Sequence, residues 1–285
     1  MTETTGTRPG DPATQPAGVG APRPAPTRRF TVQPSAVGLP LLGAVITLAV
    51  WWLVTSGLEL VHPVSLPPPQ AVWSALTAGT DVLVPALGLT TTMTLVGFLL
   101  SAVAGVLIGM ALAASRRVER MFAPLLVAVN AVPKIALGPL LVVSVGWGSK
   151  PILTMVFLLC FFPIVLSTAT GLTTAPADLA ELARSLNASW WQAFSKVRFP
   201  AALPQIFVGL KVAMPLAAIG AVIGEFYSDK EGLGYQILQY NGVGDTATAW
   251  AAIVLIALMS IGLYSALSLV ERLALPWVRA TTSAR

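Results

Sequence analysis

Long apolar segments separated by short polar ones make up most of this chain. Six of these segments reach or exceed the roughly 20 apolar residues that a helix needs to cross a bilayer. They run over residues 39–58, 84–114, 122–145, 152–174, 206–226 and 249–270. The pattern predicts an all-α polytopic membrane protein with about six transmembrane helices. An even number of spans would place both ends of the chain on the same side of the membrane.

The polar stretches divide the chain into four predicted parts. Residues 1–36 are rich in Pro, Thr, Ala and Gly and lack apolar periodicity, which predicts a disordered tail. Residues 37–83 hold the first transmembrane helix and an outer connecting segment, 84–277 the core transmembrane domain, and 278–285 a C-terminal tail. A cleaved secretory signal is the alternative for residues 39–58, but their late position and length favour a retained helix.

Basic residues predict the orientation of these spans. All but four of the 17 Lys and Arg residues lie before residue 39, after residue 270, or in the loops that follow residues 114 and 174. By the positive-inside rule these parts are cytoplasmic, so both termini are expected in the cytoplasm of a multi-pass plasma-membrane protein. The net charge of +5 then reflects orientation, and no nucleic-acid binding is predicted from it.

Residues 178–204 form a polar, charged island between two apolar spans. In its first half, apolar residues recur at helical spacing and predict an amphipathic helix. Asn187 interrupts this pattern with a residue that tolerates left-handed backbone, and Ser189 is well placed to cap a second helix. Pro200 and Pro204 are expected to limit that second helix. The island is therefore predicted to be a helix-turn-helix elbow outside the bilayer.

The elbow sequence ELARSLNASWWQAFSKVRFP resembles the EAA loop of ABC importer permeases, which reads E-A-A-x-x-x-G and, further on, I-x-L-P. The residues that match are Glu181, Ala183, Ala188, Val197 and Pro200. Leu182 replaces an Ala of the motif, and Asn187 replaces its Gly. Because Asn is the next best residue to Gly at positive φ, the same turn is expected. An ordinary amphipathic cytoplasmic loop is the alternative interpretation.

Three further stretches extend the resemblance to residues 40–277: LPPPQAVWSAL, PKIALGPL and GEFYSDKEGLGYQI. They are similar to the branch that imports nitrate, sulfonates, taurine and riboflavin or pyrimidine precursors. The resemblance implies the type I ABC importer permease fold and the transmembrane subunit of an ATP-driven importer for a small polar or anionic solute. It also implies two cytoplasmic ABC ATPase subunits that bind ATP and Mg, a second permease subunit in a homodimer, and an extracytoplasmic substrate-binding protein.

The resemblance assigns the elbow a role in coupling. Its apolar face is expected to dock on an ATPase and to pass movement to the fourth and fifth spans. The residues assigned to this ATPase coupling are Glu181, Ala183, Arg184, Asn187, Ala188, Ser189, Val197 and Pro200.

An Asn and a Lys lie within the predicted third span. Lys134 lies about 18 Å into this helix, where a Lys costs on the order of 2.5–3.5 kcal/mol to insert. Asn130 lies one turn away on the same face, and Pro133 disturbs the backbone between them. We expect Asn130 and Lys134 to line the translocation pathway. A Lys that snorkels or binds the phosphate of a membrane lipid is the alternative.

Glu225 lies at the outer end of the fifth span. It is predicted to gate the outer mouth or to position the following loop, and an ordinary interfacial carboxylate fits the sequence equally well. Lys211, near the inner end of the same span, is too far along the helix to pair with Glu225 and is predicted to be an interfacial anchor. The outer gate loop, where glycines permit a tight turn, comprises Gly232, Leu233, Gly234 and Tyr235.

Small residues recur every four positions along the second span, at Gly97, Ser101, Gly105 and Gly109. Such a stripe lets another helix approach closely. We expect it to pack either on a helix of the same chain or on the second subunit of a permease dimer.

Composition argues against chemistry within this chain, which is 55% hydrophobic and 10% charged with a mean hydropathy of +0.77. Its one Cys and one His exclude a disulfide framework and a Cys- or His-rich metal site. No G-x-x-x-x-G-K-[ST] phosphate loop is present. We therefore predict no catalytic residue, metal or cofactor in the chain. The alternative function is an ion-coupled secondary transporter or channel, in which Lys134 and Glu225 would carry the coupling.

Overall fold

The computed structural model describes residues 2, 35–58, 60–174 and 185–277 of the chain. The chain divides into two units, residues 1–46 and 47–285. The first unit contributes the start of helix α1, and the second holds all other described elements. Every regular element in the described ranges is a helix.

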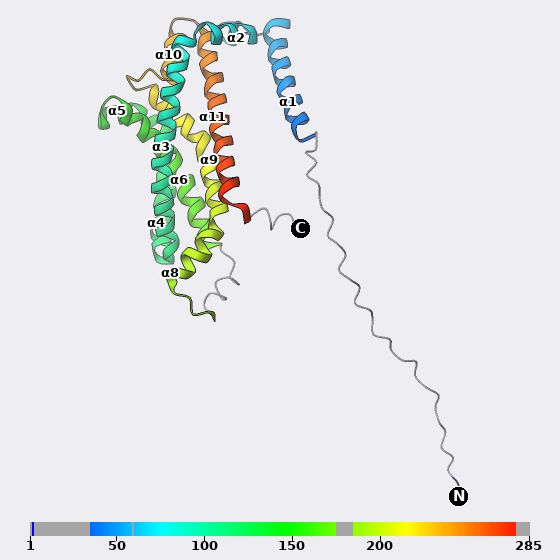
Figure 1. Ribbon diagram of the computed structural model, residues 1–285. Coiled ribbons are helices and arrows are strands. Elements are labelled where there is room, and N and C mark those ends of the chain that lie inside the picture. The colour runs from blue at the N-terminus through cyan, green and yellow to red at the C-terminus, as the bar shows by residue number, and fades with distance from the viewer. Residues whose placement is uncertain (1, 3–34, 59, 175–184, 278–285) are drawn as a thin grey trace. The chain divides into compact units, whose positions relative to one another are not determined.

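Figure 1 shows the helices in chain order. They are α1 (Ser35–Trp52), the π-helix η1 (Leu53–Gly57), α2 (Pro69–Ala78), α3 (Thr80–Ala114), α4 (Arg116–Ala131), the 3-10 helix η2 (Lys134–Leu137), α5 (Gly138–Val145), α6 (Ser149–Thr173), α8 (Trp190–Ala193), the π-helix η3 (Phe194–Arg198), α9 (Phe199–Glu225), α10 (Leu233–Gly242) and α11 (Thr246–Ala274).

Four continuous helices in the described ranges are long and apolar enough to cross a membrane. They are α3, α6, α11 and the helix from Trp190 to Glu225 that joins α8, η3 and α9. The pair α4 and α5 makes a fifth candidate, and the first predicted span is a shorter apolar helix, Leu41–Gly57. The predicted class, an all-α polytopic membrane protein, is confirmed.

The third predicted span is broken rather than continuous. Segments Arg117–Ala131 and Lys134–Val145 bend by 74° where they meet. Val132 and Pro133 have extended backbone at this break. Proline lacks the N–H that would continue the helix and disfavours helical backbone in the residue before it, so the helix ends just ahead of Pro133.

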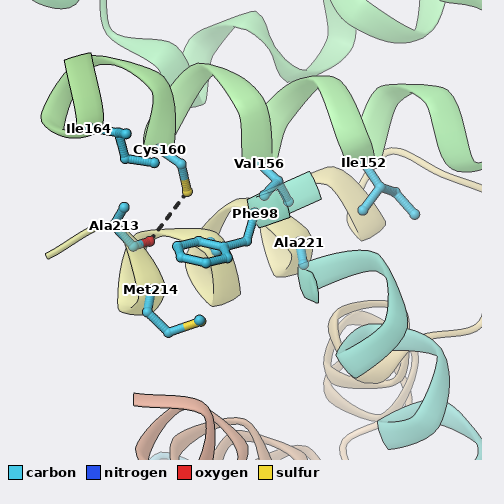
Figure 2. Packing of buried hydrophobic residues seen from close by; sticks show 9 residues of the cluster. Phe98, Ile152, Val156, Cys160, Ile164, Ala213, Met214 and Ala221 are labelled. Carbon is cyan, nitrogen blue, oxygen red and sulfur yellow. Dashed lines mark hydrogen bonds between the residues drawn. The ribbon is translucent and has the colours of Figure 1, made fainter. Parts of the chain in front are cut away.

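Helices α3, α6 and α9 pack around one apolar cluster, which includes Phe98, Val156 and Ala213 (Figure 2). The Cys160 thiol in this cluster donates a 3.3 Å hydrogen bond to the Ala213 carbonyl. Backbones of α6 and α9 come very close, because a Cβ atom added to Gly220 would lie 2.8 Å from the Cα of Val156. Close backbone approach is how membrane helices pack where lipid removes the hydrophobic driving force.

The stripe of small residues on α3 lies against α6 of the same chain. A Cβ atom added at Gly97, Gly105 or Gly109 would come within 2.8 Å of an α6 side chain. Ser101, between these glycines, is fully buried, and its hydroxyl donates a 2.7 Å hydrogen bond to the Gly97 carbonyl. The small side chains thus set the distance between α3 and α6.

An ion pair joins α9 to α11. The Nζ atom of Lys211 lies 2.7 Å from Oε2 of Glu271, and the two side chains are 23% and 22% exposed. Lys211 therefore has an acidic partner 60 residues further along the chain, rather than serving only as an interfacial anchor. Spacing along one helix cannot reveal such a partner, because the partner lies on another helix.

We expect Lys211→Ala and Glu271→Ala each to lower the free energy of unfolding by about 1–3 kcal/mol. Each substitution leaves the remaining charge unpaired at a position that is only about one-fifth exposed. The expected cost therefore lies between the cost of breaking an exposed ion pair and that of breaking a buried one. Unfolding by denaturant in lipid nanodiscs measures it. The double variant Lys211→Glu with Glu271→Lys, which swaps the two charges, should recover most of the lost stability. Lys196→Ala, at an exposed position, serves as the control. A double exchange no more stable than either single reversal would disprove the stabilising role of the pair.

Candidate functional site

The described part of the elbow turns at Asn187 and caps a helix at Ser189. Asn187 has the predicted left-handed backbone, with a φ of 49°. The Ser189 hydroxyl accepts a 3.3 Å hydrogen bond from the Gln192 N–H, and the Ser189 N–H donates a 2.9 Å bond to the Gln192 side chain. This reciprocal capping box determines where α8 begins. Outside the described residues lie three of the predicted coupling positions, Glu181, Ala183 and Arg184.

The elbow continues without a break into a membrane-spanning helix. Helical backbone runs for 36 residues, from Trp190 to Glu225. The prediction that Pro200 and Pro204 limit the second elbow helix is therefore wrong. Pro200 lies in the first turn of α9, directly after the π-helix η3, where the shifted hydrogen-bond register tolerates its missing N–H. A displacement of the elbow must consequently displace α9.

Aromatic side chains cover the elbow end of this helix. The rings of Trp190 and Phe194 stack with centroids 5.5 Å apart and planes at 8°. Trp190 and Trp191 remain 64% and 65% exposed. An exposed aromatic surface of this kind is typical of protein contacts. Among the other predicted coupling residues, Asn187 and Ser189 are exposed. Ala188, Val197 and Pro200 are half-buried.

Lys134 lies at the break between α4 and α5 and contacts Asn130, as their spacing indicates. Its ammonium group donates hydrogen bonds of 2.7 Å to the Asn130 side chain and 3.1 Å to the Asn130 carbonyl. Both residues line a cavity of about 120 Å³, together with apolar residues of α6. An ammonium has three donors, so one remains for another ligand.

Glu225 holds the loop that follows α9 against the end of that helix. Its side chain is fully buried, and Oε2 accepts a 2.7 Å hydrogen bond from the Gly234 N–H. Thr90 of α3 lies beside this carboxylate, and its hydroxyl accepts a 2.8 Å bond from the Leu233 N–H. We call Glu225, Thr90 and residues 232–234 the outer clasp, after the side of the membrane predicted for this loop. Complete burial distinguishes Glu225 from an ordinary interfacial carboxylate.

Glycine is required at two positions of the outer clasp. A Cβ atom at Gly232 would overlap the Glu225 carboxyl group, and one at Gly234 would lie 2.6 Å from the Val222 carbonyl oxygen. Tyr235 follows in α10 and is half-buried. Nothing in the local sequence indicates Thr90, because 143 residues separate it from Leu233.

The arrangement positions segments rather than reacting groups. In the described ranges, no three His, Cys, Asp and Glu side chains are grouped so that they could hold a metal ion. The polar groups of the elbow turn and the outer clasp bond mainly to backbone N–H groups. Apolar helices long enough to cross a membrane, one of them running unbroken from the aromatic elbow to the loop that Glu225 holds, define a multi-pass membrane protein.

Comparison with known proteins identifies the family. Residues 103–279 match the binding-protein-dependent transport system inner membrane component. The chain is 32% identical over 84% of its length to the formylaminopyrimidine transport permease ThiX of Halalkalibacterium halodurans, covering 95% of that protein. It is 32% identical over 83% to the putative aliphatic sulfonates transport permease SsuC of Bacillus subtilis, covering 86%.

A solved structure shares the fold. The MetNI methionine ABC transporter in an inward-facing conformation superposes with a TM-score of 0.60 at 21% identity, covering 68% of this chain and 97% of that one. The chain belongs to the family of binding-protein-dependent transport system inner membrane components. It is a non-catalytic permease subunit of an ABC importer, as the resemblance predicts, and not a secondary transporter or channel.

We expect Gly232→Ala to open the outer clasp, because its Cβ atom would overlap the Glu225 carboxylate. Overpacking of this kind costs about 1–3 kcal/mol. Amide hydrogen exchange measures the opening, and residues 228–236 should exchange faster than in the unaltered protein. The control is Gly242→Ala in α10, where an added Cβ meets no atom within 4 Å. Equal exchange in the two variants would contradict the clasp.

Proposed function

We propose that this permease couples ATP hydrolysis by two separate cytoplasmic ABC ATPases to import of a small polar or anionic solute. The elbow, residues 178–204, docks on an ATPase subunit, and ATP and Mg are bound by that partner. A second, identical permease chain completes the pathway, and an extracytoplasmic binding protein delivers the solute. The observation that carries the proposal is the unbroken helix from Trp190 to Glu225.

This helix connects the two ends of the molecule that coupling requires. Its 36 residues rise by about 54 Å, well beyond the roughly 30 Å hydrocarbon core. Closure of the ATPases on ATP moves the elbow, and α9 follows as a rigid body packed on α6. The outer clasp at its far end then moves as well. Rigid-body displacement of this kind switches a transporter between inward-facing and outward-facing states.

The gathering of basic residues at one end supports a cytoplasmic elbow. Arg120 of α4 and Arg198 of the elbow line one cavity with the ends of α3 and α6. The loops after residues 114 and 174 therefore lie on the same side, and they carry much of the basic charge. The positive-inside rule assigns this side, and with it both termini, to the cytoplasm of a plasma-membrane protein surrounded by lipid.

The names of the relatives and the free donor of Lys134 support the solute class. The relatives transport an aliphatic sulfonate or a formylaminopyrimidine by name. Lys134 and Asn130 offer a positive charge and an amide beside the bend between α4 and α5, where they can bind a polar solute. The outer gate loop, Gly232, Leu233, Gly234 and Tyr235, controls entry from the binding protein.

We expect Lys134→Gln to reduce uptake of an anionic solute by about tenfold or more, because a hydrogen bond to a charged group contributes about 1.5–3 kcal/mol. Lys134→Arg should retain most uptake. Transport of nitrate, taurine and an aliphatic sulfonate into proteoliposomes holding the complete transporter measures this. Lys150→Gln, an exposed cation at the start of α6, is the control. Normal transport in both Lys134→Ala and Lys134→Gln would remove Lys134 from the pathway.

Cross-linking tests the coupling contact directly. In a Cys160→Ala background, Ser189→Cys and Trp190→Cys are labelled with a maleimide that carries a photoactivatable group, which needs no thiol on the partner. The membranes contain the ATPase partner and are illuminated with and without ATP. We expect an adduct with the ATPase whose yield changes with nucleotide. Ser65→Cys, exposed in the segment between α1 and α2, should give none. Absence of any adduct at both elbow positions, with a folded permease and an expressed ATPase, would refute docking of the elbow.

A further inference from the structure

A cavity of about 1140 Å³ opens at the elbow end of the helices, the end that carries the label α8 in Figure 1. The last turns of α3 and α6, the first turns of α4 and the π-helix η3 form its wall. Part of this wall is apolar, from residues such as Ala123, Pro124 and Leu172. Among the described residues that line the cavity, the charged ones are Glu119, Arg120 and Arg198.

The two arginines of this cavity have no ion-pair partner among the residues that the structure describes. Within the described parts of the chain, neither guanidinium takes part in an ion pair; the pair found there joins α9 to α11. Two Arg side chains and Glu119 give the described part of the cavity lining a net positive charge. Arg198 is half-buried, and partial removal of water strengthens its attraction for an anion. A guanidinium presents a planar fork of donors that matches phosphate and sulfonate oxygens.

We infer that this cavity binds an organic oxyanion. A phosphate or sulfonate head lies between Arg120 and Arg198, and its carbon part lies against Ala123, Pro124 and Leu172. The volume exceeds what a bare inorganic ion fills, and the apolar wall favours a carbon-containing group. Two sources supply this chemistry: the headgroup of an anionic membrane lipid, or a soluble phosphate or sulfonate of the cytoplasm.

Occupation of the cavity would hold the elbow against α4. Arg198 belongs to the unbroken helix that ends at Glu225, whereas Arg120 belongs to the helix that leads to Lys134. An anion bound to both arginines fixes the separation of these helices and opposes displacement of the elbow. This regulatory consequence rests on the proposed coupling role, while the binding site itself does not.

Binding is tested on the full chain in nanodiscs of neutral phosphatidylcholine. The probe is phenyl phosphate, compared with inorganic phosphate, and the rise in unfolding temperature with concentration gives the apparent affinity. Arg120→Gln and Arg198→Gln should each weaken binding about tenfold or more, as expected for loss of a charge-assisted hydrogen bond. Glu119→Gln should strengthen it severalfold, because that change removes the opposing charge.

Each arginine has a matched control on the same helix: Arg117 for Arg120 in α4, and Lys196 for Arg198 in η3. Arg117→Gln and Lys196→Gln remove exposed cations that do not line the cavity, so neither should change the affinity. A second arm omits the soluble probe and replaces part of the neutral lipid with phosphatidylglycerol. A rise in unfolding temperature that disappears in Arg120→Gln and Arg198→Gln but persists in both controls identifies a lipid headgroup.

The outcomes separate the site from the coupling proposal. No stabilisation in either arm, or one that is equal in the arginine variants and the controls, overturns the site. With arginine-dependent binding established, the ATPase turnover of the assembled transporter is measured with bound anion. A severalfold decrease that is lost in Arg120→Gln and Arg198→Gln supports restraint of the elbow. Unchanged turnover overturns that restraint and leaves the binding site in place.

Discussion

Backbone contact between α6 and α9 at Gly220 and Gly224 is the constraint from which the rest of the permease follows. In lipid, apolar side chains gain little by leaving their surroundings, so helices associate where small residues allow dispersion contacts over a long, close interface. Glycines on α3 bring that helix close to α6 as well, and Gly97 of α3 and Gly220 of α9 both approach Val156. Because the helix from Trp190 to Glu225 carries the elbow at one end and Glu225 at the other, this packing fixes both ends on one helix.

Polar groups make bonds that favour one arrangement of the helices, a specificity that apolar packing alone does not provide. Lys211 is paired with Glu271 between α9 and α11, and Lys134 is bonded to Asn130 across the end of α4. The Glu225 carboxylate accepts from a loop N–H instead of facing solvent. A charge that is largely removed from water is costly without a partner, so the Lys211–Glu271 pair and the bond to Glu225 each favour one arrangement of the segments that they join. Arg120 and Arg198 differ, since neither has an ion-pair partner among the described residues, and this sets their cavity apart.

Local sequence patterns correctly predicted the structural features that depend only on neighbouring residues. The turn at Asn187 and the cap at Ser189 follow from backbone preference and a hydroxyl within reach of the next turn, and both are present. Helix ends near proline were harder to predict from the sequence. Pro133 breaks its helix, whereas Pro200 does not, because a π-helical turn precedes Pro200 and places it in the first turn of α9. Residue type alone does not distinguish these cases, since the neighbouring hydrogen-bond register decides the result.

The sequence by itself determined the membrane class, the positions of the apolar segments and the family resemblance of the elbow. These depend on hydropathy, helical period and short motifs, all of which act over a few turns of chain. Only the tertiary structure decided that the elbow and the fifth span are one helix, that α3 presents its small residues to α6, and that Thr90 meets Glu225 and Leu233. Such contacts join residues separated by up to 143 positions, and the distance between two such groups is set by helix packing.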